Sequence, residues 1–388
     1  MILNCKTSFN FCLVFLYTGL FLGSCTWKSA EKNQHYKPLE KSVKRGVVYW
    51  SKEEVPDSYV QWRCTFIDNS GKIIFNRPYK YCHLLPKKKQ IISIASNQLS
   101  LMDYVGNKIW SKPLQEHHHF FSDNESEVVF ALMRRKKKFN GQDIWHDGIE
   151  GYNLRGELVY SWYADKYYDD IENIKSIDGS LKDSYHLDSI NSFNDLADTL
   201  IGIKINSLAV LRNHPLKDQL PAFSDGNILI SFYEYGAIAI IDKTSKKIVW
   251  SHIISRFKEQ KGVHSLRVLP NGNFLYFQNR ATEIVVNKES QWFPQVVELN
   301  PAGKKIVWNY PKDALDTFYS PSNCSAYMYN NKTIMISYTQ NKSVVEVNRQ
   351  GIVLWEWHPD FTKELESLKN AKLKGVKRVS KETLNPFL

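Results

Sequence analysis

Short apolar runs separated by small polar groups recur along most of the chain. In residues 262–280, the largely apolar segment 266–269 precedes the group Pro-Asn-Gly-Asn at 270–273, and the apolar run 274–277 follows it. Asn and Gly adopt positive φ angles at little cost, so this group is typical of a tight turn between two antiparallel strands. The pattern predicts a β-hairpin, and His264 lies just ahead of it.

A second pattern recurs six times and predicts a hairpin turn in each copy. It consists of an Asp or Asn, a tight turn usually closed by Gly, and a short β-branched strand that ends in an aromatic residue. The Asp or Asn side chain is expected to accept hydrogen bonds from the turn backbone, and Gly to take the left-handed position. The copies lie at residues 68–75, 103–110, 153–162, 242–250, 300–308 and 348–355.

The repeat predicts an all-β fold of the six-bladed β-propeller type. One such hairpin cannot bury its own apolar face, so the copies must pack side by side. Six blades of roughly fifty-odd residues fill residues 45–361. Residues 45–50 read as a lone early strand that closes the ring against the last blade. Residues 362–388 are expected to form a short C-terminal helical tail.

The repeats are unevenly spaced at one point. The interval from Trp162 to Trp250 is much longer than the interval from Trp250 to Trp308. Residues 166–225 therefore form either an insertion within a blade or a blade whose repeat signature has decayed. Long loops of this kind on a rigid scaffold often carry function.

The N-terminus predicts a lipoprotein signal peptide over residues 1–24. An apolar run from Phe9 to Leu22 is too short for a membrane span and ends in Gly-Ser before Cys25, which is similar to a bacterial lipobox. Cys25 would be lipidated, residues 25–44 would form a flexible tether, and the protein would be lipid-anchored in the bacterial cell envelope, on its periplasmic or extracellular face. An ordinary cleaved signal peptide with a chance cysteine is the alternative.

The chain is basic, with a formal net charge of +11, and loss of residues 1–24 would remove only Lys6. Two basic runs, at residues 87–89 and 134–138, fall where hairpin loops are expected. A basic surface favours anionic lipid headgroups or an anionic substrate. No nucleic-acid-binding motif accompanies the charge, so we expect no nucleic-acid partner.

Cysteine and histidine positions give little indication of a metal site. Cys64 and Cys82 flank one predicted hairpin and are candidates for a disulfide in an oxidising compartment, which leaves Cys324 unpaired. No Cys or His spacing suggests zinc. The adjacent histidines 117–119 would alternate between the two faces of a strand, which disfavours one shared ion. Four other histidines are read as surface or packing residues: His146, His214, His252 and His358.

Four motifs, in this order along residues 114–359, resemble those of the bacterial arylsulfotransferases. The first is the string of histidines 117–119 with Phe120, and the second is His186 before the strand-like Asp-Ser-Ile at 188–190. The third is His264 with its Pro-Asn-Gly-Asn hairpin and the following Asn279. The fourth is the segment 318–323 with Ser-Ala behind it.

The resemblance implies a six-bladed propeller that moves a sulfuryl group from a small-molecule aryl sulfate to a phenol without a cofactor. His264 would be the nucleophile and form a sulfohistidine, because imidazole is neutral and nucleophilic near physiological pH. His186 and His118 would be the other catalytic histidines and candidate proton donors. Asn279, Arg280 and Tyr233 would bind substrate, with Arg267 as a further source of positive charge for the sulfate oxygens.

The chain departs from the family pattern at three positions. Ser265 follows His264 where the family usually has Asp, residues 233–235 are Tyr-Glu-Tyr where it carries an Arg, and His119 replaces an Asp. These departures favour a second hypothesis, a non-catalytic propeller that serves as a binding scaffold on the cell envelope. A third hypothesis is a quinone-dependent dehydrogenase, whose propeller repeats are similar, although the chain has no vicinal cysteine pair and no clear cluster of calcium ligands.

Overall fold

The computed structural model describes residues 46–49, 55–114, 120–123, 127–139, 142–167, 169–171, 174, 200–201, 203–233, 235–254, 262–286, 289–312, 324–339, 343–359 and 375–388. The contacts separate Met1–Ser42 from the unit Val43–Leu388, and the description below concerns the second unit alone. The expected signal peptide, Cys25 and tether lie outside the described residues. No helix in the described part of the chain is long and apolar enough to cross a membrane.

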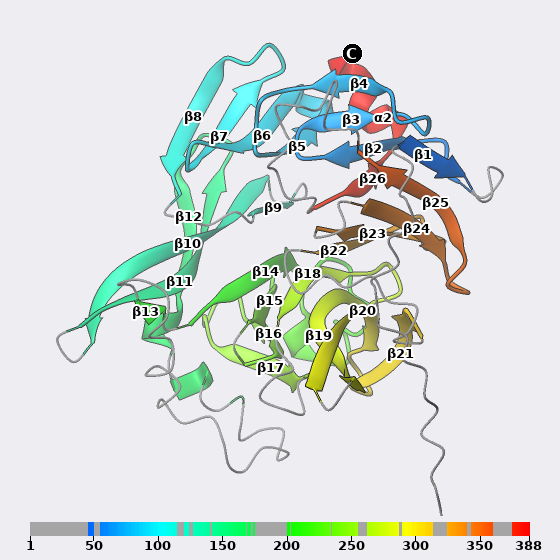
Figure 1. Cartoon of the computed structure of the whole chain (residues 1–388). Coiled ribbons are helices and arrows are strands. Elements are labelled where there is room, and N and C mark those ends of the chain that lie inside the picture. The colour runs from blue at the N-terminus through cyan, green and yellow to red at the C-terminus, as the bar shows by residue number, and fades with distance from the viewer. Residues whose placement is uncertain are drawn as a thin grey trace, which may run out of the picture. The chain divides into compact units, whose positions relative to one another are not determined.

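The described strands form six sheets, called blades 1 to 6 here, and Figure 1 shows their succession by colour. Blade 1 contains β26 (Lys377–Val379), β2 (Tyr59–Trp62), β3 (Thr65–Ile67) and β4 (Ile73–Asn76). Blade 2 contains β5 (Tyr81–Leu85), β6 (Gln90–Ala95), β7 (Gln98–Asp103) and β8 (Lys108–Pro113). Blade 3 contains β9 (Phe120–Asp123), β10 (Val128–Phe139), β11 (Gln142–Asn153) and β12 (Leu158–Tyr163), with β13 (Leu200–Ile201) beside β11.

The second half of the chain forms the other three blades. Blade 4 contains β14 (Ile205–Val210), β15 (Ile228–Phe232), β16 (Ala237–Ile241) and β17 (Ile248–Ile253). Blade 5 contains β18 (Val263–Val268), β19 (Phe274–Val286), β20 (Glu289–Asn300) and β21 (Lys305–Tyr310). Blade 6 contains β22 (Ser325–Tyr329), β23 (Thr333–Tyr338), β24 (Ser343–Asn348) and β25 (Val353–His358), with β1 (Gly46–Tyr49) beside β25. Short helices are η2 (Pro86–Lys88), η3 (Ala164–Lys166), η5 (Pro221–Phe223), α2 (Lys381–Leu384) and η8 (Asn385–Phe387).

Each copy of the repeat forms the turn between the third and fourth strands of one blade. In all six copies the side-chain oxygen of the leading Asp or Asn accepts hydrogen bonds from backbone N–H groups of its own turn, as predicted. Glycine holds the left-handed position in four turns, for example Gly71 with a φ of 86°. Lysine takes it in the other two, at Lys246 and Lys304. The register shifts by a β-bulge beside every one of these turns.

Buried apolar clusters join each blade to the next, and together they close the ring. Five clusters connect blades 1 to 6 in chain order. A sixth packs Trp355 and Trp357 of blade 6 against Val60 and Trp62 of blade 1. Because the last blade meets the first in this way, the fold is the six-bladed β-propeller that the repeat predicts.

The aromatic residue that ends the repeat also joins neighbouring blades. In four blades it is a tryptophan whose Nε1–H donates to a backbone carbonyl in the repeat turn of the next blade. The pairs are Trp110 with Leu154, Trp162 with Lys246, Trp308 with Arg349 and Trp355 with Asn69, at 2.8–3.1 Å. The indole therefore packs within the interface while its only donor is satisfied.

Strands from both ends of the described unit take part in closing the ring, as Figure 1 shows in blue and red. β1 pairs antiparallel with β25, so the predicted early strand does join the last blade. β26 pairs antiparallel with β2 and becomes the innermost strand of the first blade. This strand lies within the stretch expected to be a helical tail, and α2 that follows it spans only Lys381–Leu384. The short C-terminal helix is confirmed as α2, whereas the strand β26 was not expected, because its pairing with β2 is non-local.

Part of the long interval between repeats forms a blade strand. Residues 205–210, placed in the insertion by sequence, form β14, the innermost strand of blade 4. Just before β14, the strand β13 pairs in parallel with residues 144–145 of β11. Residues 175–199 lie outside the described residues.

The two basic runs differ in structure. Residues 87–89 lie in the turn between β5 and β6, as expected. Residues 134–138 form part of β10 instead of a loop, because carboxylates from other segments pair with them: Arg134 with Asp147, and Arg135 and Lys137 with Asp165. Four consecutive residues, 134–137, therefore find acidic partners, since Lys136 also pairs with Asp143.

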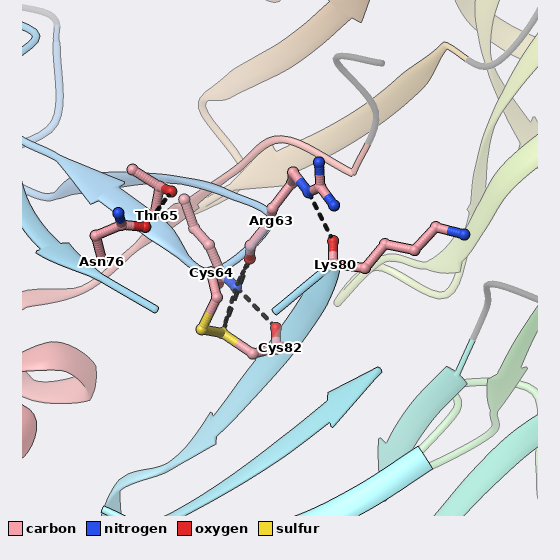
Figure 2. The surroundings of a disulfide bond; sticks show 7 residues. Arg63, Cys64, Thr65, Asn76, Lys80 and Cys82 are labelled. Atoms are coloured by element: carbon pink, nitrogen blue, oxygen red, sulfur yellow. Dashed lines mark hydrogen bonds between the residues drawn. A yellow bond between two sulfur atoms is a disulfide. The ribbon is translucent and has the colours of Figure 1, made fainter. Parts of the chain in front are cut away.

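A disulfide links Cys64 with Cys82 and joins blade 1 to blade 2, as Figure 2 shows. Cys64 follows β2 and Cys82 lies on β5. Beside the bond, Arg63 Nε donates to the carbonyl of Lys80. Cys324 is free and buried. The pairing is the one that the sequence suggested.

Candidate functional site

The innermost strands of the six blades form what we call the inner ring: β26, β5, β9, β14, β18 and β22. Along the second half of the chain its members lie side by side, with β14 beside β18, β18 beside β22 and β22 beside β26. In a propeller these strands surround the central axis. The repeat turns lie at one end of the ring, and the strands β9, β14, β18 and β22 begin at the other end.

His264 is the second residue of β18 and lies at the end of the inner ring opposite the repeat turns. The strand pairing shifts between His264 and Arg267, and Ser265 there has a left-handed φ of 55°. A bulge of this kind re-aims the side chains that flank it. The Ser265 hydroxyl donates to the carbonyl of Ala326 on β22, so it connects blade 5 to blade 6. The residue that replaces the family's Asp is therefore an interblade contact.

Two residues of blade 4 hold the His264 ring, which is half-buried. Asn206 on β14 places its amide Nδ2 at 3.4 Å from His264 Nε2. The ring of Tyr233, directly after β15, meets the imidazole edge to face at 5.7 Å between centroids. When Asn206 donates this hydrogen bond, the proton of the neutral imidazole sits on Nδ1 and Nε2 keeps its lone pair.

Backbone hydrogen bonds of Gly262 connect Asn279 to the residues around His264. The N–H of Asn279 donates to the Gly262 carbonyl, and the Gly262 N–H donates to the Tyr233 carbonyl. The Asn279 side chain is 1% exposed, and neither its Nδ2 nor its Oδ1 has a hydrogen-bond partner among the described residues. A buried amide costs free energy unless its polar atoms are paired. Asn279 is therefore a polar group available to a ligand beside His264.

A lysine supplies positive charge to the same cluster. Lys204, just before β14, places Nζ at 4.6 Å from the centroid of the Tyr233 ring, and its carbonyl accepts from the Tyr233 N–H. Lys204 and Asn206 were not predictable from sequence, because no motif marks them and only the packing of blade 4 against blade 5 brings them to His264. Arg280, expected to bind substrate, has an exposed side chain.

The structure thus brings together three of the six site residues expected from sequence: His264, Tyr233 and Asn279. The catalytic candidates His118 and His186 lie outside the described residues. In sequence they precede β9 and β14, two strands that begin at the same end of the inner ring as β18.

His214, expected to be a surface or packing residue, is buried and has a specific structural role. Its Nε2 lies 2.8 Å from the carbonyl of Gly272, in the turn of the His264 hairpin, and its ring packs on Phe223. Burial lowers the pKa of His214 below its usual value. A neutral imidazole with Nε2–H donating therefore joins blade 4 to the hairpin that carries His264.

Within the described part of the chain, no group of three or more His, Cys, Asp or Glu residues is placed to hold a metal ion. The site as described consists of a histidine, two amides, a phenol and an ammonium group. This donor set suits an anionic or polar organic ligand better than a cation.

The fold and the inner-ring histidine define a β-propeller with a candidate site at one end of its axis. The family model described as Arylsulfotransferase (ASST) matches residues 156–360, more than half of the 388 residues. The chain belongs to the arylsulfotransferase (ASST) family. The matched span includes His264, Tyr233, Asn279 and His186, whereas His118 precedes it.

Three solved structures show a distant similarity to the chain. A protein of unknown function from Bacteroides caccae has a TM-score of 0.49 and 11% identity, covering 84% of this chain and 99% of its own. Hydrazine synthase from Kuenenia stuttgartiensis has a TM-score of 0.43 and 14% identity, covering 81% and 80%. Virginiamycin B lyase from Staphylococcus aureus has a TM-score of 0.37 and 10% identity, covering 71% and 68%. Comparison with curated proteins finds no match.

Proposed function

We propose that the protein is a sulfotransferase that moves a sulfuryl group from an aryl sulfate to a phenol, with His264 as the nucleophile. The observation that carries the proposal is the position of His264 on the inner ring, half-buried and held by Asn206 and Tyr233. Membership of the arylsulfotransferase family supports the reaction class.

The proposed reaction has two steps, each a transfer of the sulfuryl group. In the first, the Asn206 amide releases Nε2 of His264, whose lone pair forms an N–S bond while the bond between sulfur and the aryl oxygen breaks. The electron pair leaves on the phenolate, which takes up a proton. In the second, the oxygen of an acceptor phenol attacks sulfur, the N–S pair returns to His264, and the acceptor proton passes to a base. A histidine intermediate divides one difficult transfer into two easier ones.

The surrounding residues supply binding and charge stabilisation. The unpaired amide of Asn279 offers hydrogen bonds to substrate oxygens, and Lys204 offers positive charge next to Tyr233. Tyr233 occupies the region where the family carries an Arg, and its ring provides one wall for a planar phenol. His186 and His118 are the proposed proton donors, since their segments lead into strands that begin at this end of the inner ring.

The envelope location is part of the proposal. Cys25 would carry the lipid that anchors the protein to a membrane, and residues 25–44 would be the tether. The disulfide between Cys64 and Cys82 supports an oxidising compartment such as the periplasm or the cell exterior.

The test is a two-stage assay with 4-nitrophenyl sulfate as donor and a second phenol as acceptor. Purified wild-type protein should release 4-nitrophenol and, without acceptor, gain the mass of one SO3 group on the peptide that carries His264. His264→Ala should lose both signals, whereas the matched control His252→Ala, on β17 of the neighbouring blade, should keep them. A correctly folded wild-type protein that is inert toward a panel of aryl sulfates would favour the binding-scaffold hypothesis instead.

A further inference from the structure

Two basic side chains of the inner ring lie close together without a carboxylate. Arg267 projects from β18 and Lys377 from the start of β26. The Arg267 guanidinium lies over the ring of Tyr327 on β22, with Cζ at 4.9 Å from the centroid. The group therefore extends across blades 5, 6 and 1, and both basic side chains are half-buried.

Arg378 has a carboxylate counter-ion, whereas Arg267 and Lys377 have none among the described residues. Arg378, next to Lys377 in sequence, is fully buried and forms an ion pair with Glu346. Within the described part of the chain, neither Arg267 nor Lys377 pairs with a carboxylate, and Arg267 Nε is buried with no hydrogen-bond partner. A buried guanidinium N–H without an acceptor is costly to the fold unless a ligand supplies one.

The electrostatics of the pair favour the binding of an anion. Burial, together with the charge of Arg267, lowers the pKa of Lys377 to about 8. Burial also lowers the pKa of Arg267, partly offset by Tyr327. Two like charges that lose hydration and repel one another are stabilised when an anion bridges them.

We propose that Arg267 and Lys377 bind the tetrahedral oxyanion of the substrate, the sulfate group of an aryl sulfate ester. The guanidinium offers parallel N–H donors that match two oxygens of one tetrahedral group, and the ammonium adds a point charge. Arg267 follows His264 by three residues on the same strand, which brings the bound oxyanion to the side of the nucleophile. The identity of the donor rests on the proposed function, whereas binding of the oxyanion does not.

The first experiment measures binding without catalysis. Titration calorimetry at constant low ionic strength would compare sodium sulfate, sodium phosphate and 4-nitrophenyl sulfate with sodium chloride. Wild-type protein should bind sulfate and the aryl sulfate. Arg267→Gln and Lys377→Gln should each weaken binding by about tenfold or more, the effect of losing a hydrogen bond to a charged group. Arg155→Gln is the matched control, because this exposed arginine lies in a repeat turn at the other end of the inner ring and should leave the affinity unchanged.

A second arm uses pH. Below pH 8 Lys377 is protonated and the site carries two positive charges, so sulfate affinity should fall as pH rises from 7 to 9. The other ionisable or charged groups on the strands around it are Tyr327 and Tyr329 on β22, His264 and Arg267 on β18, Tyr59 on β2, Arg63 after β2, and Arg378 paired with Glu346. Lys377→Gln should abolish this pH dependence of sulfate affinity. Arg267→Lys keeps the positive charge but loses the parallel N–H donors of the guanidinium, so its sulfate affinity should still fall as pH rises.

The outcomes separate this inference from the proposed function. His264→Ala protein that binds the aryl sulfate but transfers nothing supports both. Oxyanion binding that depends on Arg267 and Lys377 in a wild-type protein without transferase activity supports the site and contradicts the reaction. Equal affinity of wild type and both variants, or no binding of any of the three anions by folded wild-type protein, would overturn the inference. Binding of inorganic sulfate but not of the aryl sulfate would overturn its assignment to the donor.

Discussion

At the scale of single residues, the candidate site depends on a few backbone positions that permit close approach. Gly262 has a φ of 87°, and its carbonyl and N–H join Asn279 and Tyr233 to the strand that carries His264. A Cβ atom at this position would lie 2.8 Å from Asn279 Nδ2 and 3.0 Å from Asn279 Cβ. The site therefore requires glycine here for two reasons, the left-handed backbone and the space.

We predict that Gly262→Ala costs about 1–3 kcal/mol of stability from backbone strain and also displaces the Asn279 amide. The sulfuryl-transfer rate per folded molecule should fall about tenfold to a hundredfold, since catalysis is sensitive to small misplacements. Thermal melts and 4-nitrophenol release measure the two effects. Gly351→Ala is the control, because Gly351 has a nearly equal φ of 86° but only a 3.4 Å contact in a repeat turn. Equal rates for the two variants would contradict a role for Asn279.

At the scale of elements, the repeat turn serves two blades at once. Its leading Asp or Asn organises the turn within a blade, while a tryptophan of the preceding blade donates to that turn's carbonyl. Lys304 and Arg349 of two such turns lie over Trp250 and Trp308 of the preceding blades. The same short motif therefore stabilises both the hairpin and the interface, which explains why it recurs in every blade.

We predict that Trp308→Phe lowers the free energy of unfolding by about 1 kcal/mol more than Trp250→Phe does. Both changes replace an indole of an outer strand, but Trp308 donates to the Arg349 carbonyl at 2.8 Å, whereas no described residue accepts from Trp250. Urea denaturation of the two variants measures the difference. Equal destabilisation would mean that aromatic packing alone joins the blades.

At the scale of the whole molecule, much of the fold was predictable because its signal is local. The six turns, the six blades and the disulfide each follow from short segments or obvious pairs. The strand β26 was not predictable, because three residues form it only by pairing with β2. The same reason hid the acidic partners of residues 134–138 and the approach of Lys204 and Asn206 to His264. Local patterns predicted the blades, and long-range pairing decided the site.

The disulfide gives a further prediction at this scale. Cys64 and Cys82 close a short loop between blades 1 and 2, with a sequence separation of 18 residues. The double variant Cys64→Ala/Cys82→Ala should lose about 3 kcal/mol of stability, the entropic cost for a loop of this length. A reducing agent should lower the melting temperature of the wild type towards that of the variant and leave the variant unchanged. A wild type that is insensitive to the reducing agent while the bond is shown to be reduced would contradict this.

The position of β26 has a consequence for how the protein is made. A ribosome releases β2, β3 and β4 early, yet blade 1 lacks its innermost strand until residues 377–379 emerge, after the strands of the other five blades. Until then β2 has an open edge, and the lysine that faces Arg267 is absent. A chain that ends before residue 377, by premature termination or by proteolysis, would retain His264 and five complete blades but would lack the innermost strand of blade 1. The inner ring is therefore completed only after residues 377–379 have been made.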